Sequence, residues 1–196
     1  MTAQRRTRLD PDARRSQLVE IGVRALSRDS LYDLSLDEIA AEAGISRSLL
    51  FHYFGSKRRF QLAVVEAAAA GLLTHTEPDR SRPPSVQLRQ SIEDSVAYVS
   101  ARRGLYLSLV RGAASGDEAM REIFDRTRGA LVDRIMDGIA DLGGTPGDPL
   151  LPIAVRSWLA LTEEAIISWS PDGPVDRDRL ITFVETAFYR AVLDPP

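Results

Sequence analysis

Residues 35–57 read SLDEIAAEAGISRSLLFHYFGSK, and this stretch decides the fold of the N-terminal part of the chain. Ser35, with a glutamate three residues later, forms a capping box that predicts the start of a short helix. Gly44 allows a chain reversal there, and Ser46 caps a second short helix that runs through Tyr53. Two short helices joined by a tight turn with glycine form the helix-turn-helix pattern, whose second helix enters the DNA major groove.

Helical periodicity extends over the rest of the chain. Apolar residues recur at helical spacing from Leu18 to Leu26, and a longer helix is expected to start near Lys57. Further helices are expected near residues 84–102, 104–115, 117–141, 149–169 and 176–193. Alternating apolar runs bounded by hairpin turn signals are missing. The sequence therefore predicts an all-α protein of about nine helices.

Composition narrows the class of protein. The 196 residues are 44% apolar and 27% charged, which is typical of a soluble globular protein. The sequence has no Cys and two His, which excludes disulfides, thiolate metal sites and a His-rich metal cage. No signal peptide or membrane-spanning run is recognisable. We expect a cytoplasmic protein without metal, cofactor or membrane contact.

The net charge of −3 hides an asymmetry. Residues 1–59 carry a net charge of +3, whereas residues 60–196 carry −6. Such a difference between the two parts indicates that the basic end meets a polyanion. Arg5, Arg6 and Arg8 belong to this end, and two readings remain open for them: a solubilising tail, or a flexible arm that reaches DNA.

Residues 11–62 resemble the DNA-binding domain of the TetR family of transcriptional regulators. The resemblance rests on residues that match the family pattern in type and spacing: Ser35, Ile39, Ala40, Ala43, Gly44, Ile45, Ser46, Leu50, Tyr53, Phe54, Lys57 and Phe60. Ser48, Leu49 and Phe51 depart from it, and Phe51 lacks the hydroxyl of the usual tyrosine. The resemblance implies a helix-turn-helix domain over residues 1–56, with 1–10 as a flexible arm, and a ligand-binding and dimerisation domain over residues 57–196.

The resemblance also implies which residues contact a double-stranded DNA operator. Base contacts are expected from Arg47, Ser48, Leu49, Phe51 and His52. Phosphate contacts are expected from Ser35, Tyr53 and Lys57. Ser46, at the start of the second short helix, is also expected to contact DNA. Arginine reads guanine through two hydrogen bonds, whereas phosphate contacts position the protein without specifying sequence. For two of these residues an alternative to DNA contact remains open. Tyr53 is then a half-buried packing residue, and His52 is an exposed side chain.

In the second part, the resemblance implies a homodimer and a small-molecule effector. An apolar seam on the last two helices is expected to meet the partner: Val155, Leu159, Ile166, Trp169, Leu180, Val184 and Phe188. Candidate ligand-binding residues are Tyr98, Tyr106, Arg111, Phe124, Trp158 and Glu163. The alternative for both sets is that the apolar and aromatic side chains form a monomer core.

The expected function is therefore a repressor that binds a near-palindromic operator as a dimer and is released by its effector. An activator with the same helix-turn-helix, and a helical adaptor that binds protein, remain alternatives. An enzyme is not expected, because the common phosphate-binding, zinc-protease and nucleophile motifs are absent and no catalytic residues stand out.

Overall fold

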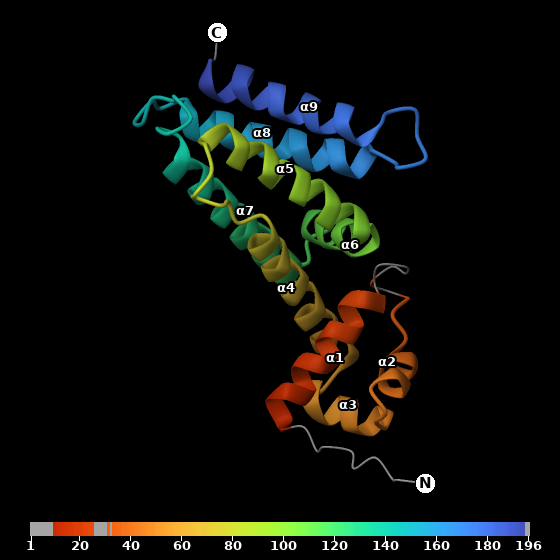
Figure 1. Cartoon of the computed structure of the whole chain (residues 1–196). Helices are drawn as coiled ribbons and strands as arrows, with labels where there is room; N and C mark the ends of the chain where they lie inside the picture. Colours follow the sequence, from red (N-terminus) through yellow and green to blue (C-terminus); the bar gives the residue numbers. More distant parts are fainter. Residues whose placement is uncertain (1–9, 26–30, 32, 195–196) are drawn as a thin grey trace.

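The computed structural model describes residues 10–25, 31 and 33–194, and these residues form helices and connecting turns without a strand. The prediction of an all-α fold is confirmed. Figure 1 shows α1, α2 and α3 at one end of the molecule and α8 and α9 at the other, with α4 and α7 running between them. The predicted arm with Arg5, Arg6 and Arg8 lies outside the described residues.

The helix bounds follow the sequence-based expectation closely. The helices are α1 (Pro11–Ala25), α2 (Leu36–Glu42), α3 (Arg47–Phe54), α4 (Lys57–His75), α5 (Pro84–Ala101), α6 (Arg103–Ala114), α7 (Glu118–Gly138), α8 (Leu151–Ser168) and α9 (Arg177–Phe188). The last predicted helix differs in one respect, because α9 changes into a π-helical stretch, η1 (Tyr189–Leu193).

Side-chain caps and two glycines define the helix-turn-helix. The Ser35 hydroxyl accepts a hydrogen bond from the Glu38 N–H at 3.3 Å, and the Ser46 hydroxyl accepts one from the Leu49 N–H at 3.2 Å. Each cap satisfies a backbone donor that has no partner inside its helix. Gly44 has φ +66°, a left-handed conformation that costs a glycine little. Gly55, with φ +75°, follows the last residue of α3. The predicted starts of both short helices and the chain reversal at Gly44 are confirmed.

The three N-terminal helices share a core with α4. Leu18, Leu50 and Phe60 are fully buried there, and the rings of Phe54 and Phe60 meet edge to face at 4.8 Å. Gly22 allows the close approach of α1 to α4, because a Cβ at this position would lie 2.5 Å from a methyl carbon of Val64. This packing buries one face of α3 and leaves its outer face exposed.

The same core continues into the second part of the chain. It includes Leu105 and Leu109 of α6 together with Met120 of α7. The N–H of Leu31 donates to the Ser108 hydroxyl at 3.3 Å, and the Gln61 side-chain amide donates to the Leu31 carbonyl at 2.7 Å. Helix α4 therefore packs against both parts, and a division of the chain at residue 56 stays a proposal.

A second core lies between α5, α7, α8 and α9. Val96, Val155, Ile181, Val184 and Phe188 are fully buried in it. These residues bring α8 and α9 side by side at the end of the molecule remote from α3 (Figure 1).

Candidate nucleic-acid interface and ligand cavity

Helix α3 has one buried face and one exposed face. Leu50 and Phe54 are buried, and Ile45 is half-buried against the same core. Arg47, Ser48, Leu49 and His52, four of the side chains predicted to face DNA, are exposed on the other side. The predicted readers therefore share one surface, at the end of the molecule opposite α9 (Figure 1).

Arg47 is held by two contacts on this surface. Its guanidinium donates a 2.7 Å hydrogen bond to the Asp37 carboxylate and lies over the Phe51 ring, 5.6 Å from the ring centre. Both charged side chains of the pair are more than half exposed. Such a pair contributes roughly 0–1 kcal/mol, so a DNA base can replace Asp37 at small cost.

The remaining predicted contacts lie around α3. Phe51 and Tyr53 are half-buried against the first core, which leaves part of each ring accessible. Lys57 is exposed in the first turn of α4, where Ser56 caps the helix by accepting from the Arg59 N–H. Backbone N–H groups at a helix start favour an anion, which suits a phosphate at this position.

The residues predicted to meet a partner lie inside the chain. Of the seven, Trp169 is half-buried, and the other six are buried in the second core: Val155, Leu159, Ile166, Leu180, Val184 and Phe188. Trp169 also uses its indole N–H on the Val175 carbonyl at 2.7 Å. The apolar seam that the sequence contains is therefore packed against the chain's own helices.

Exposed apolar side chains also occur on α8 and α9, outside this buried seam. Ile153, Leu161 and Phe183 are 61%, 37% and 54% exposed. On α8, small side chains at 157 and 160 lie at helical spacing between the two apolar residues. The sequence already indicated a second apolar side on α8, because its apolar residues are not confined to one side of the helix. The hydrophobic pattern did not distinguish the side that meets its own chain from the side that remains free.

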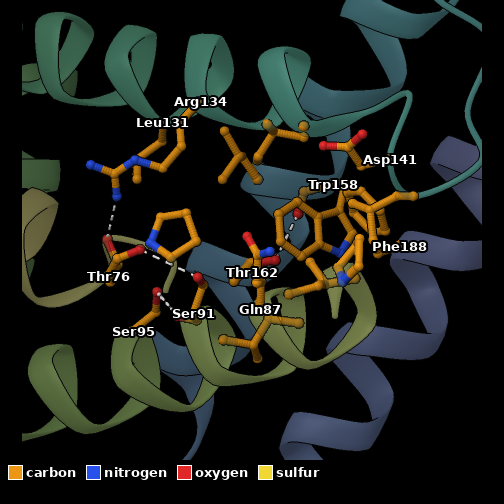
Figure 2. Close-up of a pocket in the computed structure, with 18 of the residues that line it drawn as sticks. Thr76, Gln87, Ser91, Ser95, Leu131, Arg134, Asp141, Trp158, Thr162 and Phe188 are labelled. Atoms are coloured by element: carbon orange, nitrogen blue, oxygen red, sulfur yellow. Dashed lines mark hydrogen bonds between the residues drawn. The ribbon is translucent and has the colours of Figure 1, made fainter. Parts of the chain in front are cut away.

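The main cavity of the second part measures about 190 Å³. It opens between the end of α4, α5, α7 and α8, and Figure 2 shows its side chains. Of the six predicted ligand residues only Trp158 lines it. Among the lining groups that the sequence analysis missed are Thr76, Ser91, Ser95 and Arg134.

Four other predicted ligand residues meet at a small space of about 30 Å³, lined by Tyr98, Tyr106, Phe124 and Glu163. Burial raises the pKa of the Glu163 carboxyl above its usual value, against the opposing effect of the Arg128 guanidinium. Burial also raises the pKa of the Tyr106 hydroxyl. This space has the size of about one water molecule, so the four side chains pack around it with little room for a ligand. Arg111 is exposed on α6 and lines neither cavity.

Two other features are absent from the described residues. No helix there combines the length and hydropathy that crossing a bilayer requires. No group of three or more His, Cys, Asp or Glu side chains in the same part of the chain is arranged to hold a metal ion.

Comparison with known proteins identifies the helix-turn-helix. Residues 18–64 match the family model described as bacterial regulatory proteins, tetR family. The HTH-type transcriptional regulator BetI of Agrobacterium fabrum is 35% identical over 54 residues, which are 28% of this chain and 26% of BetI. BetI of Brucella suis is 36% identical over 52 residues. The match therefore spans about a quarter of the length of these curated relatives.

Solved structures share the fold over almost the whole chain. A TetR-family transcriptional regulator from Streptomyces coelicolor is 28% identical, with a TM-score of 0.77 over 92% of this chain and 79% of that one. GusR of Salmonella enterica is 19% identical, with a TM-score of 0.71 over 94% of this chain and 97% of GusR. AibR, in complex with isovaleryl coenzyme A and operator DNA, is 17% identical, with a TM-score of 0.63 over 93% of this chain and all of AibR.

These findings place the chain in the class of helix-turn-helix proteins with a helical second part. The N-terminal match identifies residues 18–64 as a helix-turn-helix domain of the tetR family of bacterial regulatory proteins, and the chain as a whole shares the fold of a TetR-family transcriptional regulator.

Proposed function

We propose that the protein is a transcriptional repressor that binds a near-palindromic operator as a homodimer and leaves it when a small molecule binds. The observation that carries this proposal is the outer face of α3. Its arginine, serine and leucine side chains at 47, 48 and 49 are exposed together, on a helix whose other face is buried. An exposed helix of this kind fits the major groove.

The proposed DNA contacts divide into two kinds. Arg47 reads guanine, and Leu49 and Phe51 pack on thymine methyl groups. Ser48 and His52 add polar contacts on the same face. Phosphates are contacted by Tyr53, Lys57 and the hydroxyls of Ser35 and Ser46. These contacts position α3 without specifying sequence.

The proposed dimer uses the exposed apolar face of α8 and α9 with Ile153, Leu161 and Phe183, in place of the buried seam. Exposed apolar side chains that gather on one face indicate an interaction site, because burying them against a partner removes their surface from water. A symmetric dimer formed through α8 and α9 carries two copies of α3, which have to lie on one face of the duplex, about one helical turn of DNA (~34 Å) or a multiple of it apart. Two such helices read the two halves of a palindrome.

The proposed effector site is the cavity of about 190 Å³. AibR shares the fold and carries both a small molecule and operator DNA, and we extend this combination to the present chain. An effector acts only if it binds the DNA-free conformation more tightly than the DNA-bound one. Helices α4 and α7 run from the cavity to the helix-turn-helix (Figure 1), and they provide a physical connection between the two sites.

In-vitro selection of DNA sequences bound by the full chain tests the proposal. We expect a two-fold symmetric sequence with a guanine in each half-site. Recovery of no common sequence, with binding that does not change with salt, would instead support the protein-binding adaptor.

A further inference from the structure

One end of the 190 Å³ cavity carries a positive charge without an acidic partner. Arg134 of α7 is half-buried, and its guanidinium donates to the Thr76 hydroxyl at 3.1 Å and to the Leu73 carbonyl at 2.9 Å (Figure 2). Both acceptors are neutral. Among the described residues no carboxylate forms an ion pair with it. The guanidinium is thus held in place, and its other N–H groups remain for a ligand.

The hydroxyl groups beside Arg134 are already engaged. The Ser91 hydroxyl donates to the Thr76 carbonyl at 3.3 Å, and the Ser95 hydroxyl donates to the Ser91 carbonyl at 2.7 Å. The Thr76 hydroxyl donates to the Leu72 carbonyl at 2.8 Å. Because these hydrogens serve backbone carbonyls, Arg134 is the strongest hydrogen-bond donor at this end of the cavity.

The other end of the cavity is aromatic and apolar. The Trp158 and Phe188 rings meet edge to face at 4.9 Å, and the Trp158 N–H is used on the Val184 carbonyl at 2.9 Å. Trp158 therefore offers only its ring to a ligand. Leu131 and Ile135 extend this apolar wall along α7.

The other charged lining groups do not neutralise Arg134. Arg80 is exposed and adds a second positive charge to the lining. Asp141 is also exposed, and Figure 2 shows it beside Trp158 and Phe188 rather than beside Arg134. Because water and salt screen an exposed carboxylate, it interacts only weakly with a ligand group at the opposite end of the cavity.

We propose that the cavity binds a small carboxylic acid with an apolar body, its carboxylate on Arg134 and its body against Trp158 and Leu131. A planar carboxylate matches the two parallel N–H groups of a guanidinium. For the size of the body, an apolar cavity of about 150 Å³ in another protein holds a benzene ring. The proposal rests on the effector site proposed above and assigns its ligand class.

A matched series of ligands tests the class with the full chain. Octanoate, octanamide and octylamine share one carbon skeleton and differ in head group and charge. Titration calorimetry should show binding of octanoate, with binding of the amide and the amine weaker by about 10- to 100-fold, the range expected when a charge-assisted contact is lost. A preference for octylamine, or equal binding of all three, overturns the proposal.

A pair of variants ties the effect to the cavity. Arg134→Gln removes the charge but keeps an amide that reaches Thr76, and we expect it to abolish the preference for octanoate over octanamide. Arg121→Gln is the matched control, because Arg121 is exposed on the same helix and, among the described residues, its side chain donates only to the Ala113 carbonyl. Unchanged octanoate binding by Arg134→Gln overturns the assignment of this residue.

DNA binding separates this proposal from the one on which it rests. If the chain binds its selected operator but no member of the series, the carboxylic acid assignment fails while the regulator function stands. If octanoate binds and no DNA sequence is selected, the ligand class stands and the regulator function fails. The melting temperature of each variant without ligand confirms that it is folded.

Discussion

Arg47 at the start of α3 donates a 2.7 Å hydrogen bond to Asp37 of α2, across the turn of the helix-turn-helix. Arg47 is the residue proposed to read guanine. If Arg47 reads guanine as proposed, its contact with Asp37 has to be replaced by the contact with the base when DNA binds.

This pair leads to the first prediction. Arg47→Ala should lose about 1–3 kcal/mol of discrimination at one base pair of each half-site and leave the other positions unchanged. Competition binding with singly substituted operators measures this effect. A variant that keeps the full base preference at every position would show that another residue reads the guanine.

Asp37→Asn changes the other member of the Arg47–Asp37 pair. It removes a negative charge from the proposed DNA surface and releases Arg47. We expect tighter binding to all sequences, by less than about tenfold, since the exposed pair is worth at most about 1 kcal/mol. Weaker binding would indicate that Asp37 positions Arg47 for the base.

The second prediction concerns Lys57 in the first turn of α4. Lys57→Ala should weaken binding about equally for all sequences and reduce the salt dependence by about one phosphate contact. Binding measured at several salt concentrations tests this. Arg177→Ala, at an exposed position at the start of α9 at the other end of the molecule, is the control and should leave the slope unchanged. A loss confined to one base position would assign Lys57 to base reading instead.

The third prediction concerns the proposed dimer face. Phe183→Glu places a charge on a side chain that is 54% exposed in the single chain, so folding should survive. Light scattering should show a particle of 21.6 kDa, the mass of one chain, where the unchanged protein gives twice that mass. Val86→Glu, at an exposed apolar position on α5, should remain dimeric. A dimeric Phe183→Glu would place the interface elsewhere.

The fourth prediction uses Glu163. Burial raises the pKa of its carboxyl in the folded state, so the folded chain holds the proton more tightly than the unfolded chain. The stability from this group is fully present below the unfolded pKa, near the usual value of 4.5, and is lost as pH rises through the folded pKa. Glu163→Gln removes this dependence, and its stability relative to the unchanged protein should therefore increase with pH.

Urea unfolding at pH 5 and pH 8 measures this difference. Glu77→Gln, at an exposed position in the turn after α4, is the matched control for the loss of one carboxylate. If the Glu163→Gln variant becomes relatively less stable at the higher pH, the ionised carboxylate stabilises the fold through Arg128, and the effect of burial is smaller than this account requires.

The local structure of the helix-turn-helix could be predicted from sequence because its signals are local. Ser35, Gly44 and Ser46 act through the backbone of their own turn, and α3 needs only Leu50 and Phe54 to define its buried face. Helix bounds elsewhere followed from periodicity for the same reason. The change from α9 to η1 had no signal of this kind.

The partner face and the cavity depend on tertiary packing. Val155 and Ile153 are both apolar residues of α8, yet one is fully buried and the other 61% exposed. Residue type alone does not decide between them. The cavity brings Thr76 together with Arg134, which lies 58 positions later in the sequence, beyond α5 and α6 and within α7. Aromatic residues were a poor guide, because Tyr98 and Phe124 pack around a space too small for a ligand.

The salt dependence of binding to the selected operator tests the central claim most directly. The account predicts that the logarithm of the association constant falls linearly with the logarithm of the salt concentration, by about 0.9 for each phosphate contacted. It also predicts that two chains bind each operator. An association constant that stays the same as salt rises, with no sequence preferred over random DNA, would contradict the assignment of α3 as a DNA-reading helix.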